Sequence, residues 1–237
     1  MDLAGRPVET DLSPVSWVAD ALQGQTWATV SSFVPPVFPA YARVFHPAIR
    51  YDGDVDVDVP WAEVARANGT AAHPLMEWGS ITGSMDFFGE DNQTPLWDDA
   101  PAMGHLPEQV AAALVPVLRR HTSTPEDCWF GLSTSWGDDL GAALDVPRRG
   151  FHLVRGPVEL ATVNLRPEPS NQSANAWWPA DRAWFVATDV DLVTTYVGGS
   201  EALVADLLAE PRLEAAAATA GQSTAWDADT VNPLPDQ

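Results

Sequence analysis

The chain has 237 residues, of which 46% are hydrophobic, so it is long enough to bury a substantial core in one large domain or two small ones. Acidic residues number 33 and basic residues 12, which gives a formal net charge of -21. Such a surface repels polyanions, and this argues against nucleic acid and anionic membranes as partners. A salty habitat or a codon bias would produce the same acidic excess.

Every basic residue is an arginine, because the chain contains no lysine. This excludes the P-loop lysine of nucleotide-binding proteins and every mechanism that forms a Schiff base on a lysine. The single cysteine, Cys128, excludes a disulfide within the chain and a zinc site built from cysteines. Composition therefore removes several common kinds of catalytic and metal-binding site.

No feature of the sequence directs the chain to a membrane or out of the cell. No apolar stretch reaches the roughly 20 residues of a membrane-spanning helix, and the first residues lack the basic and apolar regions of a secretion signal. We therefore expect a cytoplasmic protein with no membrane partner. No repeat and no long linker divides the chain, so we expect one domain over residues 1–219 and a mostly extended tail over residues 220–237.

The first half of the chain predicts short helices and strands joined by loops. The predicted elements are a helix over residues 14–22, strands over 27–34 and 41–45, a helix over 61–67, and loops over 73–101. Ser13 suits the N-cap of the first helix, and Gly24 suits its end. Asn68 and Gly69 end the second helix. Glycine, proline and acidic residues are frequent in 73–101, which is typical of loops.

The second half predicts one long helix and most of a sheet. The predicted elements are a helix over residues 107–121, strands over 128–133, 151–155, 158–165 and 183–192, and a helix after Ser200. Val110, Leu114 and Leu118 recur at helical spacing, and Pro116 should bend that helix. These elements predict an α+β fold with a mainly antiparallel sheet, helices packed on one side, and long acidic loops.

The stretch from Asp52 to Glu63 fits either a calcium-binding loop or a strand. Its acidic residues fall at positions one, three, five, seven and twelve of an EF-hand loop: Asp52, Asp54, Asp56, Asp58 and Glu63. Val57, however, occupies the position where that loop needs glycine for a sharp turn. Valines also alternate with the aspartates, which is the period of a half-buried strand. We therefore favour the strand and expect no metal here.

Other catalytic or metal-binding motifs are weak. The five histidines form no pair at metal-ligand spacing, so the sequence predicts no metal and no cofactor. A site assembled from distant residues, such as His73, His105 and an acid, is the alternative. The G-L-S-T-S-W-G stretch lacks the last glycine of a nucleophile elbow, because Ser135 stands there. Cys128 begins an apolar strand, which favours an inert thiol.

Tryptophans beside acidic residues are the most informative pattern in a chain with 11 tryptophans. The predicted ligand-binding residues are Trp136, Asp138, Trp177, Trp178, Asp181 and Arg182. An indole face attracts cations and C–H groups while a carboxylate accepts hydrogen bonds, so this set suits a sugar or an organic cation. A carboxylate pair with Asp189 and Asp191 nearby would also suit hydrolysis. The competing interpretation is that the tryptophans simply pack the core.

Four long stretches are specific enough to be compared with known families. They are Y-A-R-V-F-H-P-A from Tyr41, H-T-S-T-P-E-D-C-W-F-G-L from His121, N-A-W-W-P-A-D-R-A-W-F-V-A-T-D-V-D from Asn175, and T-Y-V-G-G-S-E-A-L-V-A-D-L-L-A-E-P-R-L-E-A from Thr195. With the ending D-A-D-T-V-N-P, they resemble a bacterial family of uncharacterised cytoplasmic proteins over most of the chain. The resemblance implies a single unit and brings no activity, cofactor or catalytic residue.

Two functions follow from these patterns. The first is a non-catalytic intracellular binding or interaction protein whose acidic surface meets a basic protein partner. The alternative is a carboxylate-dependent hydrolase, or a protein that binds a sugar or a small polar or cationic ligand through Trp-Asp loops. A concave pocket in which an acid and an aromatic converge would distinguish the second from the first.

Overall fold

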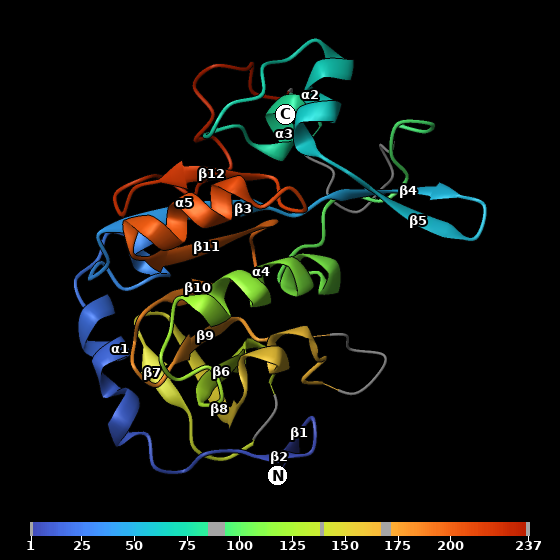
Figure 1. Cartoon of the computed structure of the whole chain (residues 1–237). Helices are drawn as coiled ribbons and strands as arrows, with labels where there is room; N and C mark the ends of the chain where they lie inside the picture. Colours follow the sequence, from blue (N-terminus) through green and yellow to red (C-terminus); the bar gives the residue numbers. More distant parts are fainter. Residues whose placement is uncertain (1, 85–92, 138–139, 167–171, 236–237) are drawn as a thin grey trace.

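A computed structural model describes residues 2–84, 93–137, 140–166 and 172–235, except for the side chain of Trp136. Its main feature is one eight-stranded sheet in the order β12-β3-β11-β10-β9-β6-β8-β7 (Figure 1). Every neighbouring pair of strands in this sheet is antiparallel. The α+β class and the antiparallel sheet are therefore confirmed.

The strands and helices have the following bounds. The sheet contains β3 (Ala40–Phe45), β6 (Cys128–Ser133), β7 (Leu144–Val146), β8 (Arg149–Gly156), β9 (Ala176–Pro179), β10 (Phe185–Ala187), β11 (Thr194–Gly199) and β12 (Ala215–Ala218). The helices are α1 (Ser16–Leu22), α2 (Trp61–Asn68), α3 (Trp78–Thr82), α4 (Glu108–Arg120) and α5 (Glu201–Ala209). Two pairs, β1 (Asp2–Leu3) with β2 (Arg6–Pro7) and β4 (Ala48–Asp52) with β5 (Val55–Val59), form separate two-stranded sheets.

The main sheet is covered on both faces, and each face has its own hydrophobic core. Consecutive side chains of a strand point to opposite faces, so Trp177 packs under α4 and α5 while Trp178 packs on the side of α1. The two longer helices share one face, and α1 covers part of the other (Figure 1). Serine caps α5, because the Ser200 Oγ accepts a hydrogen bond of 3.1 Å from the Leu203 N–H.

A third core lies beside the sheet and is built largely from tryptophan. Trp61, Trp78 and Trp97 are all buried, with neighbouring ring centroids 5.3 Å apart. The Trp61 Nε1–H donates to the carbonyl of His46 at 2.7 Å, so its polar atom is satisfied inside this core. Helices α2 and α3 surround these rings, and the β4–β5 hairpin extends away from them (Figure 1).

Two predicted strands are wrong, and a third is shorter than predicted. Residues 27–34 form a turn around a 3-10 helix (Val30–Ser32), because the Val30 N–H bonds to the carbonyl of Gln222 instead of to the sheet. Residues 158–165 begin with another 3-10 helix (Val158–Thr162) directly after Pro157. The strand predicted over 183–192 is reduced to β10, because the chain turns away from the sheet after Ala187.

Several elements were not predicted from the sequence. They are α3, inside the predicted loop region 73–101, and the strands β1, β2, β4, β7, β9, β11 and β12. The tryptophans of β9 were expected in a loop, but β9 pairs with both β6 and β10. Short strands of this kind depend on their neighbours in the sheet more than on local propensity.

The acidic stretch after Asp52 is a strand, as predicted, since β5 pairs with β4 in a hairpin. Its burial is uneven: Val59 is 1% exposed, whereas Val55 is 61% exposed. The valines therefore reach a core only where the hairpin joins the body. In the part of the chain that is described, no helix is both long and apolar enough to cross a membrane.

Gly198 in β11 offers a test of how tightly the face bearing α1 is packed. An added Cβ would lie 2.6 Å from Phe38 Cδ2 and 2.8 Å from Val34 Cγ1, so Gly198→Ala should lower the free energy of unfolding by about 1–3 kcal/mol. Gly221→Ala is the control, because a Cβ there meets nothing within 4 Å. Urea denaturation of both variants measures this, and equal stabilities would contradict the packing.

Candidate functional site

A cavity of about 270 Å³ lies at the edge of the sheet where β6 ends, β8 begins and the chain leaves β10. Its lining combines two arginines, two aspartates, several hydroxyl and amide groups, and aromatic rings. The lining residues are Trp27, Phe33, Ser133, Ser135, Arg148, Arg149, Phe151, Asn175, Ala187, Thr188, Asp189, Val190 and Asp191. It is a concave place where acids and aromatics converge.

An ion pair between Arg149 and Asp189 forms one wall of the cavity. The Arg149 Nη1 lies 2.7 Å from the Asp189 Oδ2, and the two side chains are only 9% and 12% exposed. The other carboxylate oxygen of Asp189 accepts a hydrogen bond of 3.3 Å from the Asp191 N–H. Arg149 Nη2 is buried and has no hydrogen-bond partner among the described residues. The guanidinium therefore keeps a donor group that no described residue uses.

Burial acts on both charges of this pair. It raises the pKa of Asp189, an effect that the positive charge of Arg149 opposes. It also lowers the pKa of Arg149, against the attraction of Asp189 and Asp191. An arginine still remains protonated throughout the physiological range. The two residues thus form a buried ion pair. Removing one of them would leave the other charge buried without a partner.

Two guanidinium groups lie over aromatic rings of the cavity wall. The guanidinium carbon of Arg148 is 4.7 Å from the ring centroid of Trp27, and that of Arg149 is 5.3 Å from the same centroid. Arg149 also lies 4.4 Å from the ring centroid of Phe33. Cations at these distances are attracted to the ring faces, so Trp27 helps to hold both arginines at the cavity wall.

The floor of the cavity is fixed by buried Asn175. Its Oδ1 accepts from the Ser133 N–H at 2.9 Å, and its Nδ2 donates to the carbonyls of Gly104 and Thr188 at 3.0 and 3.1 Å. These bonds join the end of β6 to the segments before β9 and after β10. The polar groups of the cavity therefore sit on a rigid frame, as a binding site requires.

The predicted site residues Trp177 and Trp178 do not form a common site. They are adjacent on β9, point to opposite faces of the sheet, and are 0% and 1% exposed. Asp138 lies outside the described residues, as does the side chain of Trp136. The tryptophan pair therefore belongs to the two cores and cannot contact a ligand.

Asp181 and Arg182 also lie away from the cavity. The Asp181 carboxylate accepts hydrogen bonds from Thr122 Oγ1 at 2.8 Å and from the Ser123 N–H at 2.7 Å. Burial would raise the pKa of Asp181, but the hydrogen bonds from Ser123 and Thr122 outweigh it and leave the pKa lowered. Arg182 lies over the ring of Trp17 at 5.1 Å. Both residues hold loops in place, whereas the predicted Asp189 and Asp191 do line the cavity.

The sequence reasoning missed Arg148, Arg149, Trp27 and Asn175. One signal was present: the chain has only two pairs of adjacent arginines, and Arg148-Arg149 is the pair that lies just before a predicted strand. The other residues come from segments far apart in the sequence, and no local pattern connects them.

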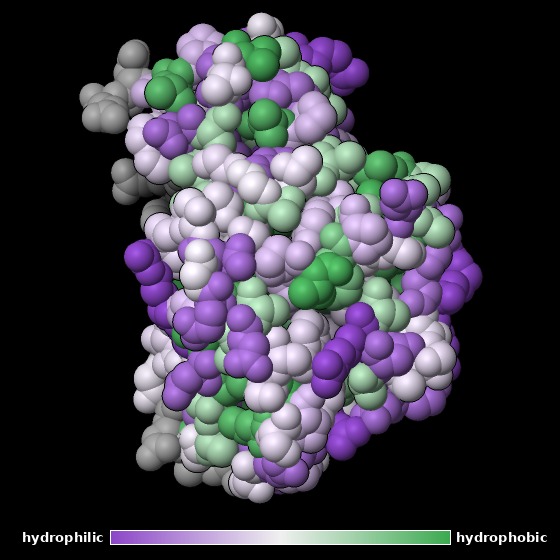
Figure 2. All heavy atoms as spheres, turned by 90° about the vertical axis from the view of Figure 1, so that its left-hand side faces the viewer, coloured by the Kyte–Doolittle hydropathy of each residue, from purple (hydrophilic) through white to green (hydrophobic). Residues whose placement is uncertain are grey.

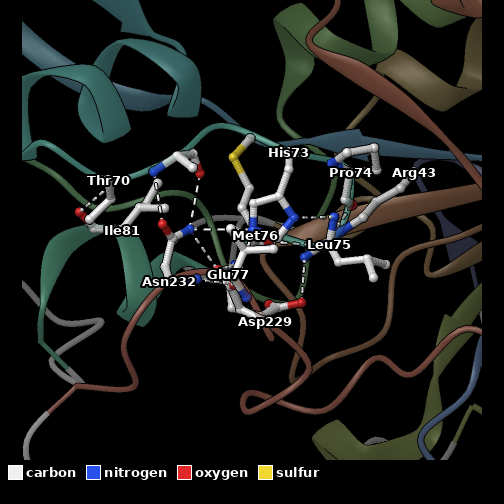
Figure 3. A network of polar contacts seen from close by, with 12 residues as sticks. Arg43, Thr70, His73, Pro74, Leu75, Met76, Glu77, Ile81, Asp229 and Asn232 are labelled. Carbon is white, nitrogen blue, oxygen red and sulfur yellow. Dashed lines mark hydrogen bonds and ion pairs between the residues drawn. The ribbon is translucent and has the colours of Figure 1, made fainter.

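A second polar cluster lies between α3 and the C-terminal segment (Figure 3). Arg43 Nη2 is 2.9 Å from Glu77 Oε1, and both side chains are buried. The Asp229 carboxylate accepts from the N–H groups of Val231 and Asn232 at 2.9 Å each and lies 3.0 Å from His73 Nε2. This cluster anchors the segment that was predicted as a tail. Trp226, in the same segment, is 43% exposed.

The alternative metal site with His73 and His105 does not form. His73 instead contacts Asp229, and the described residues contain no group of three histidine, cysteine, aspartate or glutamate side chains placed to hold a metal ion.

Comparisons of this chain with protein-family models, curated proteins and solved structures find no match. The interpretation of the site therefore rests on its geometry.

Glu77 should make stability depend on pH. Burial raises its pKa to about 7, against the opposing effect of Arg43. The folded state therefore holds this proton more tightly than the unfolded chain, and the resulting stability is lost as pH rises from about 4.5 to about 7. The advantage of the wild type over Glu77→Gln should shrink by up to roughly 3 kcal/mol between pH 5 and pH 8.

Urea denaturation across this pH range measures the change. Glu201→Gln, at an exposed helix start, controls for the loss of one negative charge. A constant difference between the wild type and Glu77→Gln would show that this carboxyl does not titrate as its burial implies.

Proposed function

We propose that this protein is a non-catalytic binding protein that holds a small polar molecule in the cavity beside Arg149 and Asp189. The observation that carries the proposal is the Arg149 side chain, which lines the cavity, is nine-tenths buried, and has no hydrogen-bond partner for Nη2 among the described residues. Buried polar groups without a partner are rare and each calls for an explanation. A ligand that accepts this hydrogen bond supplies one.

The chemistry of the described lining favours binding over catalysis. It contains hydroxyl, amide and carboxylate groups but neither histidine nor cysteine. The Asp189 carboxylate is already engaged by Arg149 and by the Asp191 N–H, which leaves it poorly placed to move a proton. Cys128 stands at the opposite end of β6, and burial raises the pKa of its thiol to about 12. A thiol of this kind is a poor nucleophile at neutral pH.

The alternatives predicted from the sequence are less well supported. Hydrolysis would need a free carboxylate pair, and only Asp191 of the two cavity aspartates is exposed. A sugar or an organic cation would need an open indole face, but Arg148 and Arg149 already lie over Trp27. The family resemblance adds no activity to either alternative.

A screen of small molecules by thermal shift tests the binding proposal. Compounds that raise the Tm of the wild type should fail to do so for Ser135→Trp, because Ser135 is exposed and lines the cavity and the added indole fills it. A ligand at 100 times its Kd stabilises a protein by about 2.7 kcal/mol. That is several degrees in Tm for a chain of this size.

Ser16→Trp is the matched control for this screen, since Ser16 is exposed on α1 and does not line the cavity. The binding proposal is wrong if the hits raise the Tm of Ser135→Trp as much as that of Ser16→Trp. It is also wrong if a broad set of neutral, anionic, cationic and zwitterionic compounds does not raise the Tm of the wild type.

A second candidate function is supported by the β4–β5 hairpin, which projects from the body (Figure 1). Its aspartates Asp52, Asp54, Asp56 and Asp58 are exposed, and Val55 is 61% exposed beside them. An acidic, partly apolar projection suits a basic protein partner.

On the face turned to the viewer in Figure 2, hydrophobic residues form separate small groups among hydrophilic ones.

The hairpin can be tested with an arginine-rich peptide. Asp54→Asn with Asp56→Asn should weaken its binding roughly fivefold more than Asp20→Asn with Glu201→Gln, which removes the same charge at other exposed positions. Fluorescence anisotropy at low and near-physiological ionic strength measures this difference. Equal losses would mean that the peptide responds only to the overall negative charge.

A further inference from the structure

We infer that the ligand of this cavity is a small zwitterion of amino-acid size, with its carboxylate at Arg148 and Arg149 and its ammonium at Asp191. This inference rests on the proposed function and names the ligand class. It depends on three properties of the cavity: where its positive groups lie, how its charges balance, and how much space it offers.

The positive groups favour a carboxylate. Arg149 is held by Asp189 through Nη1, which leaves Nη2 as a donor without a partner in the described residues. Arg148 is exposed at the rim, and its guanidinium shares the ring of Trp27 with that of Arg149. A carboxylate suits the planar donors of a guanidinium group, and the positive charge of either arginine attracts it.

The negative groups favour an ammonium on the same molecule. Asp191 lines the cavity and is exposed, while its N–H is fixed on Asp189. Among the described residues, the cavity lining thus has two positive and two negative side chains, Arg148 and Arg149 against Asp189 and Asp191. A simple anion would be repelled by the net charge of -21 on the protein. A simple cation would be repelled by the two guanidinium groups. A zwitterion pairs with both kinds of group and leaves the net charge of the cavity unchanged.

The remaining lining sets the size and the character of the ligand. The volume of about 270 Å³ is near the lower end for small-molecule sites, which suits a molecule of amino-acid size. Phe33, Phe151 and Ala187 offer apolar surface to a side chain. The hydroxyl groups of Ser133 and Thr188 are engaged by Ser135 and Thr195. These contacts favour a ligand with a modest apolar group over a fully polar one.

Three matched sets of probes test the ligand class on the full chain: free amino acids, their C-terminal amides and their N-acetyl derivatives. Calorimetry should find a free amino acid that binds at least about tenfold more tightly than its amide or its acetyl derivative, because each derivative loses one charge-assisted contact. Arg148→Gln should lower the affinity for that amino acid about tenfold and leave the affinity for its amide unchanged. Arg50→Gln, on the distant β4 strand, should change neither affinity.

Two results would overturn the assignment: derivatives that bind as well as the free amino acid, or an Arg148→Gln variant that binds it as the wild type does. Failure of this inference differs from failure of the proposed function. If only neutral or singly charged compounds bind, and Ser135→Trp abolishes that binding, the cavity is a binding site for another class of ligand. If no compound binds, both are wrong.

Discussion

Burial of the central strands on both faces is the constraint on which the rest of the structure depends. Every residue of β6, β9 and β10 is buried, so their side chains alternate between two cores and leave no room for polar groups along the strands. Along these three strands, polar side chains can gather only at the strand ends. The cavity lies at such a place, because β6 and β10 both stop there and Asn175 bonds to the last residue of β6 and to the residue after β10.

The net charge of the chain makes the arginines of this cavity notable. In a chain with far more acids than arginines, an arginine that is buried and only partly paired is unusual. A buried ion pair is weak evidence for stability, because desolvation of the two charges offsets most of their attraction. The pair of Arg149 and Asp189 is therefore better explained by what it presents to the cavity than by what it adds to the folding free energy.

Local patterns predicted the elements that local forces determine. Helix α4 follows from the spacing of Val110, Leu114 and Leu118, and the hairpin strand β5 follows from its alternation of valine and aspartate. Patterns misplaced Trp177 and Trp178, because a pair of tryptophans before a proline suits a loop as well as a short central strand. The cavity was not predictable, since it requires Trp27, Arg149 and Asp189 to meet through strand pairing that no local window contains.

The wall that carries Trp27 also depends on the far end of the chain. The Val30 N–H donates to the carbonyl of Gln222 at 3.0 Å, and the Thr224 N–H donates to the carbonyl of Ala28 at 2.9 Å. A few residues later, Asp229 fixes the same segment to the third core. Residues 28–31 contribute little regular structure of their own, so these bonds are what hold Trp27 beside the arginines. The C-terminal segment thus completes the cavity wall, although none of its described side chains lines the cavity.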